Sequence, residues 1–243
     1  MTAIMKACAF APVVMGLALA GCSKKTTGET GPGAPGASAS AAASASAPGG
    51  SQPTADTAAS DEPITIATFS IEKFDQAKAA KPDILKALAG VVKKYDVVAV
   101  QGIKDDTDEV AQALLREANQ GARGAYGVVV SEPTGREKND EYWRERYAFY
   151  YRKSRIDAYD EGKLYDDSAD DDFPREPFAA RFGVRGAKLG FVLITIRTDA
   201  KRTLKELAQM SKVIAWTKEA FPEEEKLIVL GDFNADCRHA TPE

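Results

Sequence analysis

Short apolar runs alternate with segments of helical periodicity between residues 64 and 231 of this chain. Runs rich in β-branched and aromatic residues predict strands at 64–69, 96–101, 126–130, 147–151, 190–196 and 226–231. Apolar spacings of three and four residues predict helices at 82–95, 108–119 and 203–221. Because continuous apolar strands alternate with helices, the sequence predicts an α/β domain with buried sheets.

The first predicted helix begins with Pro82, a residue suited to a first helical turn. Each predicted helix has one apolar face. These faces contain Ile84, Leu85, Leu88, Val91 and Val92 in the first helix, Val110, Leu114 and Leu115 in the second, and Leu204, Leu207, Val213, Ile214 and Phe221 in the third.

The N-terminal residues 1–21 have the pattern of an export signal. Lys6 precedes an apolar stretch, Ala7–Ala20, that is short for a membrane span. The stretch ends in "LAGC", Leu19–Cys22, which resembles the bacterial lipobox and implies lipid on Cys22 and a membrane anchor in the cell envelope. Ser23 follows Cys22, and in a bacterium with two membranes this implies the outer membrane. An ordinary secretory signal is the alternative.

Residues 22–62 are predicted to be a disordered tether, since Ala, Ser, Gly, Pro and Thr dominate and cannot form a core. The folded domain is then 63–243. The net charge of −4 does not favour tight, nonspecific binding to nucleic acid, although an enzyme could still contact it briefly.

Seven strings in order resemble deoxyribonuclease I-like members of the endonuclease/exonuclease/phosphatase superfamily. They are "ITIATFSIEKF", "KKYDVVAVQGIKD", "VVSEPTGR", "ERYAFYYR", "YDD…DFPREPFAARF", "FVLITIRT" and "LIVLGDFNADC". The resemblance covers Ile64–Cys237 and implies a four-layer α/β sandwich, with two mixed sheets packed face to face and helices outside. It also implies hydrolysis of DNA phosphodiester bonds with Mg²⁺ or Ca²⁺ held by carboxylates, and with a histidine base.

Some residues that the resemblance makes functional are retained. Glu145 matches the carboxylate that orients the catalytic histidine, and Arg175 matches a phosphate contact. Asp232 and Asn234, in "GDFN", match residues that hold the phosphate and the attacking water. From the residues alone, Asp232 and Asn234 could instead be turn formers, and Arg175 a structural cation.

Three positions depart from the family pattern. Ser70 replaces an asparagine that contacts the metal or phosphate, and Gly102, predicted just beyond the strand ending at Gln101, replaces the metal glutamate. Arg197 replaces a catalytic histidine, and arginine cannot act as a general base. We expect Arg197 to form a salt bridge with Glu145 or, alternatively, to bind phosphate.

The chain ends at Glu243, so the family's last strands, with their final aspartate and histidine, are expected to be missing. The resemblance implies that Cys237 has lost a disulfide partner in that segment. His239 is expected to be a solvated residue rather than a base, and the acidic stretch 165–173 a solvated loop rather than a metal site.

These observations predict a catalytically degenerate envelope lipoprotein, a pseudoenzyme that binds a phosphate-containing ligand, nucleic acid or an unidentified protein partner. One alternative is an active metal-dependent nuclease in which Asp105 or Asp232 binds the metal; another is a non-functional truncated fragment.

Overall fold

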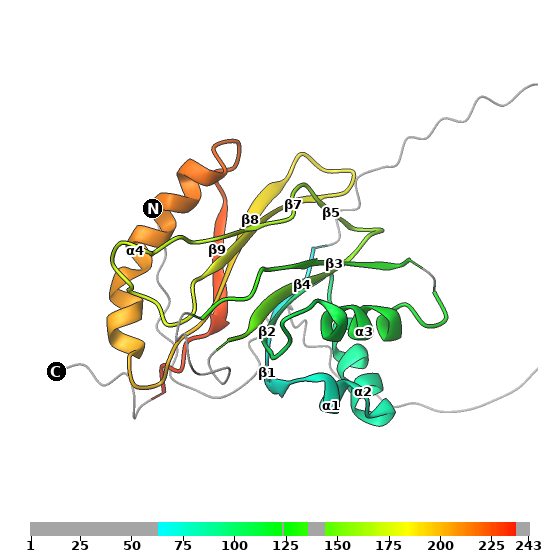
Figure 1. Ribbon diagram of the computed structural model, residues 1–243. Helices are drawn as coiled ribbons and strands as arrows, with labels where there is room; N and C mark the ends of the chain where they lie inside the picture. The colour runs from blue at the N-terminus through cyan, green and yellow to red at the C-terminus, as the bar shows by residue number, and fades with distance from the viewer. Residues whose placement is uncertain (1–62, 123, 136–143, 237–243) are drawn as a thin grey trace, which may run out of the picture. The chain divides into compact units, whose positions relative to one another are not determined.

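The computed structural model describes residues 63–122, 124–135 and 144–236, and their strands form two mixed sheets (Figure 1). The first sheet has the order β1-β2-β4-β3, with strands at Ile66–Phe74, Val97–Ile103, Arg146–Arg152 and Tyr126–Val130, respectively. β1 and β2 are parallel, whereas β4 is antiparallel to both of its neighbours.

The second sheet has the order β5-β7-β8-β9, with strands at Ile156–Ala158, Phe178–Val184, Gly190–Arg197 and Leu227–Asp232. A two-residue strand, β6 (Lys163–Leu164), also pairs with β7. β8 and β9 are parallel, and the other pairs are antiparallel.

Aromatic side chains fill the space between the two sheets. Phe149 of β4 lies against Phe178 and Phe182 of β7, with ring centroids 5.6 and 5.5 Å apart. Val97 and Ala99 of β2 belong to the same buried cluster. The sheets therefore pack face to face, and their inner faces share one apolar core.

Helices cover the outer faces of both sheets. The short α1 (Gln76–Ala79), α2 (Pro82–Val92) and α3 (Glu109–Ala118) lie on the first sheet, and α4 (Thr203–Ala220) lies on the second. Pro82 occupies the start of α2, as expected. The layer order helix, sheet, sheet, helix is the predicted four-layer α/β sandwich. No helix within the described residues is long and apolar enough to cross a membrane.

The predicted elements are present with shifted ends, and the pattern gives no prediction for β5, β6, β7 or α1. β1 begins two residues later than predicted and continues to Phe74. β7 reads FAARFGV, in which Arg181 and Gly183 interrupt the apolar run, although its flanking strands bury most of it.

One apolar position in α4 was wrongly assigned. Leu204, expected on the buried face, is 50 % exposed. The buried face instead contains Glu206, Met210, Val213 and Thr217, which recur at helical spacing. A carboxylate therefore lies on the core-facing side of this helix.

Candidate functional site

The predicted site residues gather where β1, β8 and β9 approach one another. Arg197 ends β8 and is the register partner of Asp232, which ends β9. Ser70 of β1 donates a hydrogen bond from Oγ to Asp232 Oδ2 at 2.8 Å, which joins the two sheets. Arg197 Nε lies 3.6 Å from the same carboxylate oxygen. Residues distant in the sequence thus form one polar cluster.

Glu145 is the buried centre of this cluster. Its side chain has no exposed surface, and its Oε2 accepts a hydrogen bond from Arg197 Nη1 at 3.1 Å. Lys104 Nζ lies 3.8 Å from Oε2, and Arg175 Nε lies 3.8 Å from Oε1. The expected salt bridge between Glu145 and Arg197 is present, and two more cations share the carboxylate.

Arg175 supports the cluster from the segment before β7. Its side chain is 8 % exposed, and its Nε donates to the carbonyl oxygen of Arg197 at 3.0 Å. The backbone N–H of Arg197 donates to the hydroxyl of Tyr147 at 3.1 Å, and burial raises the pKa of that phenol. Both contacts hold the end of β8 in place. The Arg175 contact is the kind expected of a structural cation, and the phosphate contact that the resemblance implies for Arg175 stays a prediction.

Gly102 lies inside β2 rather than beyond its end, which corrects the predicted strand boundary. The pairing of β2 with β4 is irregular between Val100 and Ile103, and Gly102 has a φ of +85°. A Cβ at this position would lie 2.1 Å from Ile71 O and 3.2 Å from Arg197 Nη1. The backbone conformation favours glycine, and the adjacent space already contains the Arg197 guanidinium.

Asp232 and Asn234 form a turn after β9. The N–H of Asn234 donates to Asp232 Oδ1 at 3.3 Å, and Asn234 has a left-handed φ of +46°. The Asn234 amide donates from Nδ2 to Thr198 O at 2.6 Å. These residues therefore do perform the turn-forming role, while Asp232 also faces Ser70 and Arg197.

The cluster has a positive formal balance. Lys104, Arg175 and Arg197 contribute three positive charges, and Glu145 and Asp232 contribute two negative charges, giving about +1 at neutral pH. The side chains of Lys104 and Arg197 are 16 % and 21 % exposed. Cations at partly exposed positions can attract an anion.

A second buried carboxylate, Glu206 of α4, lies under the loop that follows β8. Its Oε1 accepts a hydrogen bond from Asp199 N at 2.9 Å, and its Oε2 has no hydrogen-bond partner. Burial raises the pKa of the Glu206 carboxyl to about 7, while Arg175 and Arg202 oppose that rise. The Glu206 carboxyl therefore changes its charge near neutral pH.

The divalent metal that the resemblance implies does not fit these residues. Within the described ranges, no group of three His, Cys, Asp or Glu side chains could hold a metal ion. Asp105, a candidate replacement ligand, instead accepts from Val110 N at 2.9 Å near the start of α3. The other candidate, Asp232, accepts a hydrogen bond from Ser70 and has the Arg197 guanidinium beside it. Glu145, which the resemblance assigns to orienting a histidine, has three cations around it instead.

The acidic stretch 165–173 differs from the solvated loop predicted for it. Asp167 and Asp172 are only 2 % and 7 % exposed. Lys212 of α4 donates to both Asp170 and Asp172 at 2.8 Å, and these hydrogen bonds raise the pKa of Lys212. The expectation is wrong for the two buried carboxylates: Asp172 pairs with Lys212 of α4, and Asp167 accepts a hydrogen bond from Phe173 N at 2.8 Å.

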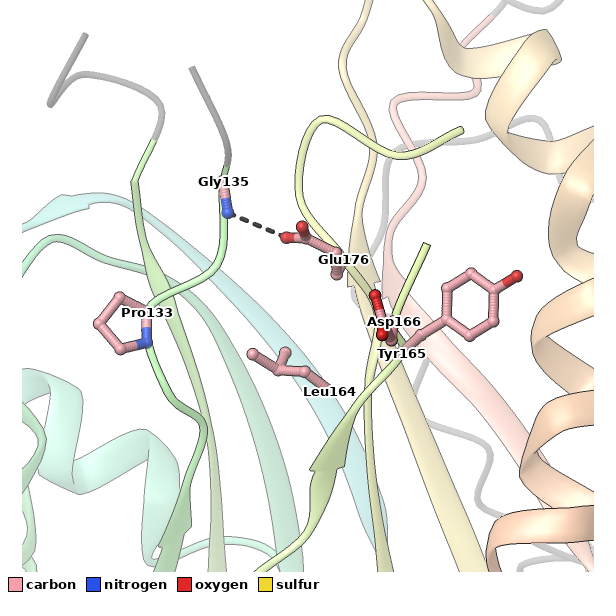
Figure 2. A pocket seen from close by; sticks show the side chains of 6 residues that line it. All are labelled: Pro133, Gly135, Leu164, Tyr165, Asp166 and Glu176. Carbon is pink, nitrogen blue, oxygen red and sulfur yellow. Dashed lines mark hydrogen bonds between the residues drawn. The ribbon is translucent and has the colours of Figure 1, made fainter. Parts of the chain in front are cut away.

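A separate pocket of about 250 Å³ is lined in part by the first two residues of this stretch and by none of the residues of the polar cluster (Figure 2). The Glu176 carboxylate, which lines it, accepts from Gly135 N at 3.0 Å. The complete lining is Pro133, Gly135, Leu164, Tyr165, Asp166 and Glu176.

Sequence reasoning missed Lys104 and Glu206. Lys104 directly follows the end of β2, and the irregular pairing around Gly102 breaks the alternation of side chains, so the sequence gives no clear signal for it. Glu206 shares its helical face with Met210 and Val213. Cys22, Cys237 and His239 lie outside the described residues, so the predictions for them stay predictions.

Comparison with known proteins gives consistent matches. The pattern of the family described as "Endonuclease/Exonuclease/phosphatase family" matches residues 68–243. Human Deoxyribonuclease-1 is 30 % identical over 184 residues, which cover 74 % of this chain and 63 % of that protein. Deoxyribonuclease-1-like 1 of Bos taurus is 32 % identical over 186 residues, covering 76 % and 57 %. The chain thus spans less than two thirds of either relative.

The fold is also found among solved structures. The crystal structure of a functionally unknown conserved protein from Enterococcus faecalis matches with a TM-score of 0.52 and 15 % identity. The match covers 72 % of this chain and 68 % of that one. At this identity, the likeness supports the two-sheet α/β architecture and nothing more specific.

Proposed function

This chain belongs to the endonuclease/exonuclease/phosphatase family, and from that premise we propose that it is a non-hydrolysing member that binds a phosphate-containing ligand. The observation that carries the proposal is the position of Arg197. Its guanidinium pairs with buried Glu145 and lies beside Gly102, where the family pattern expects a metal carboxylate. The site has a cation where hydrolysis needs a metal and a base.

Loss of hydrolysis follows from the chemistry of the substituted groups. Arginine remains protonated at every physiological pH, so Arg197 cannot accept a proton from water. Gly102 offers no oxygen ligand for a hard cation. Removal of one acid–base group typically lowers a rate about 10²–10⁴-fold, and the metal ligand is changed together with it.

Anion binding is supported by the charges that remain. Lys104 and Arg197 are partly exposed, and the five charged side chains of the cluster sum to about +1. A phosphate group would accept hydrogen bonds from the Arg197 guanidinium and the Ser70 hydroxyl, in competition with Asp232. This competition predicts modest affinity and a strong dependence on salt.

Calorimetric titrations of the protein with inorganic phosphate and with a short single-stranded oligonucleotide test this proposal. We expect saturable binding of at least one ligand without turnover, and at least about a 10-fold weaker affinity in Arg197→Met. Arg116→Met, an exposed arginine of α3, is the control and should bind as the unmodified protein does. Absence of saturable binding to both ligands would contradict the binding proposal but not the loss of hydrolysis.

One observation favours a second candidate, an active DNA-hydrolysing enzyme. Human Deoxyribonuclease-1 is 30 % identical, and Glu145, Arg175 and Asp232 retain the family residue types. This candidate requires metal-dependent cleavage of DNA that EDTA abolishes. It also requires a metal ligand to replace the family glutamate at position 102.

For localisation, we propose attachment to the cell envelope through lipid on Cys22, in the outer membrane where the cell has two. The support is the "LAGC" sequence after an apolar stretch. Metabolic labelling with radioactive palmitate should mark the protein, and Cys22→Ser should remove the label. Cys8→Ser is the matched control and should keep it, whereas equal labelling of both variants would contradict the anchor.

A further inference from the structure

The first described residue, Pro63, lies at the end of the two sheets that is opposite the polar cluster. Its carbonyl oxygen accepts a hydrogen bond from Arg155 Nη2 at 3.2 Å. Ser70, further along β1, and Arg197, the last residue of β8, belong to the polar cluster at the other end. A strand rises about 3.3 Å per residue, so roughly 20 Å separate Pro63 from Ser70.

The first sheet brings cations to the Pro63 end. Arg152, the last residue of β4, donates from Nη2 to Lys93 O at 2.9 Å, so the turn after α2 lies beside the end of this strand. The next residue, Lys153, donates from its backbone N–H to Ala125 O at 2.9 Å, just before β3. Because β1 and β2 are parallel neighbours that both begin here, these cations lie at the end where β1 begins.

The turn between β7 and β8 reaches the same end of the molecule. Arg185 N donates to Arg155 O at 2.8 Å, and Arg155 is the residue that contacts Pro63. Lys188 is exposed in this turn, and the adjacent Leu189 is 38 % exposed. The turn therefore presents an apolar side chain beside a cation.

These segments together form a surface that we call the basic end. Its residues are Lys93, Lys94, Arg152, Lys153, Arg155, Arg185 and Lys188. The four lysines are exposed, and none of them has an ion pair with another described residue. They are therefore available to bind an anionic partner.

Acidic residues only partly offset this positive charge. Asp96 pairs with Arg152, and Asp157 pairs with Arg185, which leaves the basic end at about +5 at neutral pH. The segment before β9 adds three glutamates, 223–225, and Lys226, and still leaves about +3. The whole chain has a net charge of −4, so its positive charge is concentrated at this end.

An anionic membrane surface is the partner that this end fits. The sequence predicts lipid on Cys22 and a tether over residues 22–62, which joins the domain at Pro63. A flexible chain of that length has a root-mean-square span of roughly 35 Å, so lipid on Cys22 would keep the basic end near the membrane. Clustered lysine and arginine side chains bind anionic headgroups, and apolar side chains beside them enter the interfacial region.

We propose that the basic end docks on anionic lipid headgroups, with Leu189 in the interfacial region and the polar cluster turned away from the membrane. This inference rests on the proposed lipid on Cys22 for its location in the cell, whereas the charge of the surface belongs to the folded domain. Docking restricts the orientation of the domain, so Arg197 and Ser70 face the solution and a ligand reaches them without entering the membrane.

Binding of the full chain to lipid vesicles tests the proposal. The protein contains Cys22→Ser, so that lipid on the chain does not contribute and a failure of the proposed lipidation does not affect the result. Cosedimentation compares vesicles of phosphatidylglycerol and phosphatidylcholine with vesicles of phosphatidylcholine alone. We expect at least about 10-fold tighter binding to the anionic vesicles, and loss of this preference in about 1 M salt. Equal binding to both compositions would overturn the proposal.

Charge reversal locates the surface. Lys153→Glu combined with Lys188→Glu should weaken binding to the anionic vesicles at least about 10-fold. Lys86→Glu combined with Lys205→Glu is the matched control, because these exposed lysines lie on α2 and α4 and the change in net charge is the same. Thermal melts establish that both variants are folded. Equal losses in both variants, or a loss of oligonucleotide binding with vesicle binding unchanged, would overturn the proposal.

Two labelling positions test the orientation, in a background with all three cysteines replaced by serine. An environment-sensitive fluorophore on Ala187→Cys, in the turn between β7 and β8, should emit at shorter wavelength when anionic vesicles are added. The same fluorophore on Lys205→Cys should not shift, because α4 begins near the end of β8 that bears Arg197. Equal shifts at the two positions would contradict the orientation.

Discussion

Arg197 Nη1 lies 3.2 Å from the point that a Cβ on Gly102 would occupy. A carboxylate side chain at position 102 would therefore need space that the Arg197 guanidinium now occupies. The same Cβ would lie 2.1 Å from Ile71 O, and the φ of +85° is unfavourable for other residues. The two main departures from the family pattern are thus coupled by geometry, and restoring one alone should not rebuild the site.

Substitution of Gly102 should destabilise the fold without restoring hydrolysis. For Gly102→Ala we expect a loss of about 1–3 kcal/mol in the free energy of unfolding, because of the positive φ and the backbone clash. The free energy of unfolding of Gly102→Glu should fall by at least the same amount. Urea denaturation measures both values.

Gly90 provides the control for this substitution. It lies in α2, and a Cβ there would meet nothing within 4 Å. Gly90→Ala should therefore stabilise the protein by about 0.4–1 kcal/mol. If Gly102→Ala were neutral or stabilising as well, the strain assigned to position 102 would be wrong.

Neutralising Glu145 should destabilise the folded protein, because three cations share its buried carboxylate. We expect Glu145→Gln to lower the free energy of unfolding by about 3 kcal/mol, since Arg175 and Arg197 would each lose the attraction of the Glu145 charge. The exposed pair of Asp106 and Arg144 is the comparison, with Nη1 and Oδ1 3.3 Å apart. Asp106→Asn should cost at most about 1 kcal/mol.

A double-mutant cycle separates the direct contact from other effects of Glu145. The loss in Glu145→Gln should be smaller when Arg197→Met is already present, with a coupling free energy of about 1–3 kcal/mol. Additive effects would mean that the 3.1 Å contact contributes no interaction energy.

The raised pKa of Glu206 predicts a fall in stability as pH increases. Its folded-state pKa of about 7 exceeds the ordinary value of 4.5, so the folded protein binds this proton more tightly than the unfolded chain does. The contribution is fully present below about pH 4.5 and is lost as pH rises to about 7, a difference of about 3 kcal/mol. Asp199, Arg175 and Arg202 are the charged residues acting on this carboxyl.

Glu206→Gln should remove this pH dependence. The amide oxygen can still accept from Asp199 N, and no charge develops in the core at high pH. At pH 8 the variant should be about 1–3 kcal/mol more stable than the unmodified protein. Thermal or urea unfolding at pH 5 and pH 8 measures the change, with the exposed Glu219→Gln as control. An unchanged pH profile in Glu206→Gln would contradict the assignment.

The sequence was sufficient for the regular parts of the fold. The apolar runs that became β2, β3, β4, β8 and β9 differ from their predicted limits by no more than two residues. Continuous burial on both faces makes such strands recognisable. The salt bridge of Glu145 and Arg197 is also expected from the sequence, because the resemblance places these two positions in one site.

Long-range packing explains what the sequence did not reveal. β7 contains Arg181, two alanines and a glycine, and its strand conformation depends on pairing with β8 and β5. Lys212 neutralises an acidic stretch about 40 residues earlier in the chain. Whether Gly102 ends or continues β2 depends on Ile71 and Arg197, which belong to other strands.

The most direct test of the central claim is plasmid-DNA cleavage by the purified full chain. The assay contains Mg²⁺ and Ca²⁺, with EDTA in parallel samples, and a thermal melt of the same protein establishes that it is folded. We predict no cleavage above the buffer control and a cooperative melt. EDTA-sensitive cleavage that Asp232→Ala abolishes would contradict the account, because hydrolysis would then proceed with Gly102 and Arg197 in place of the family's glutamate and histidine.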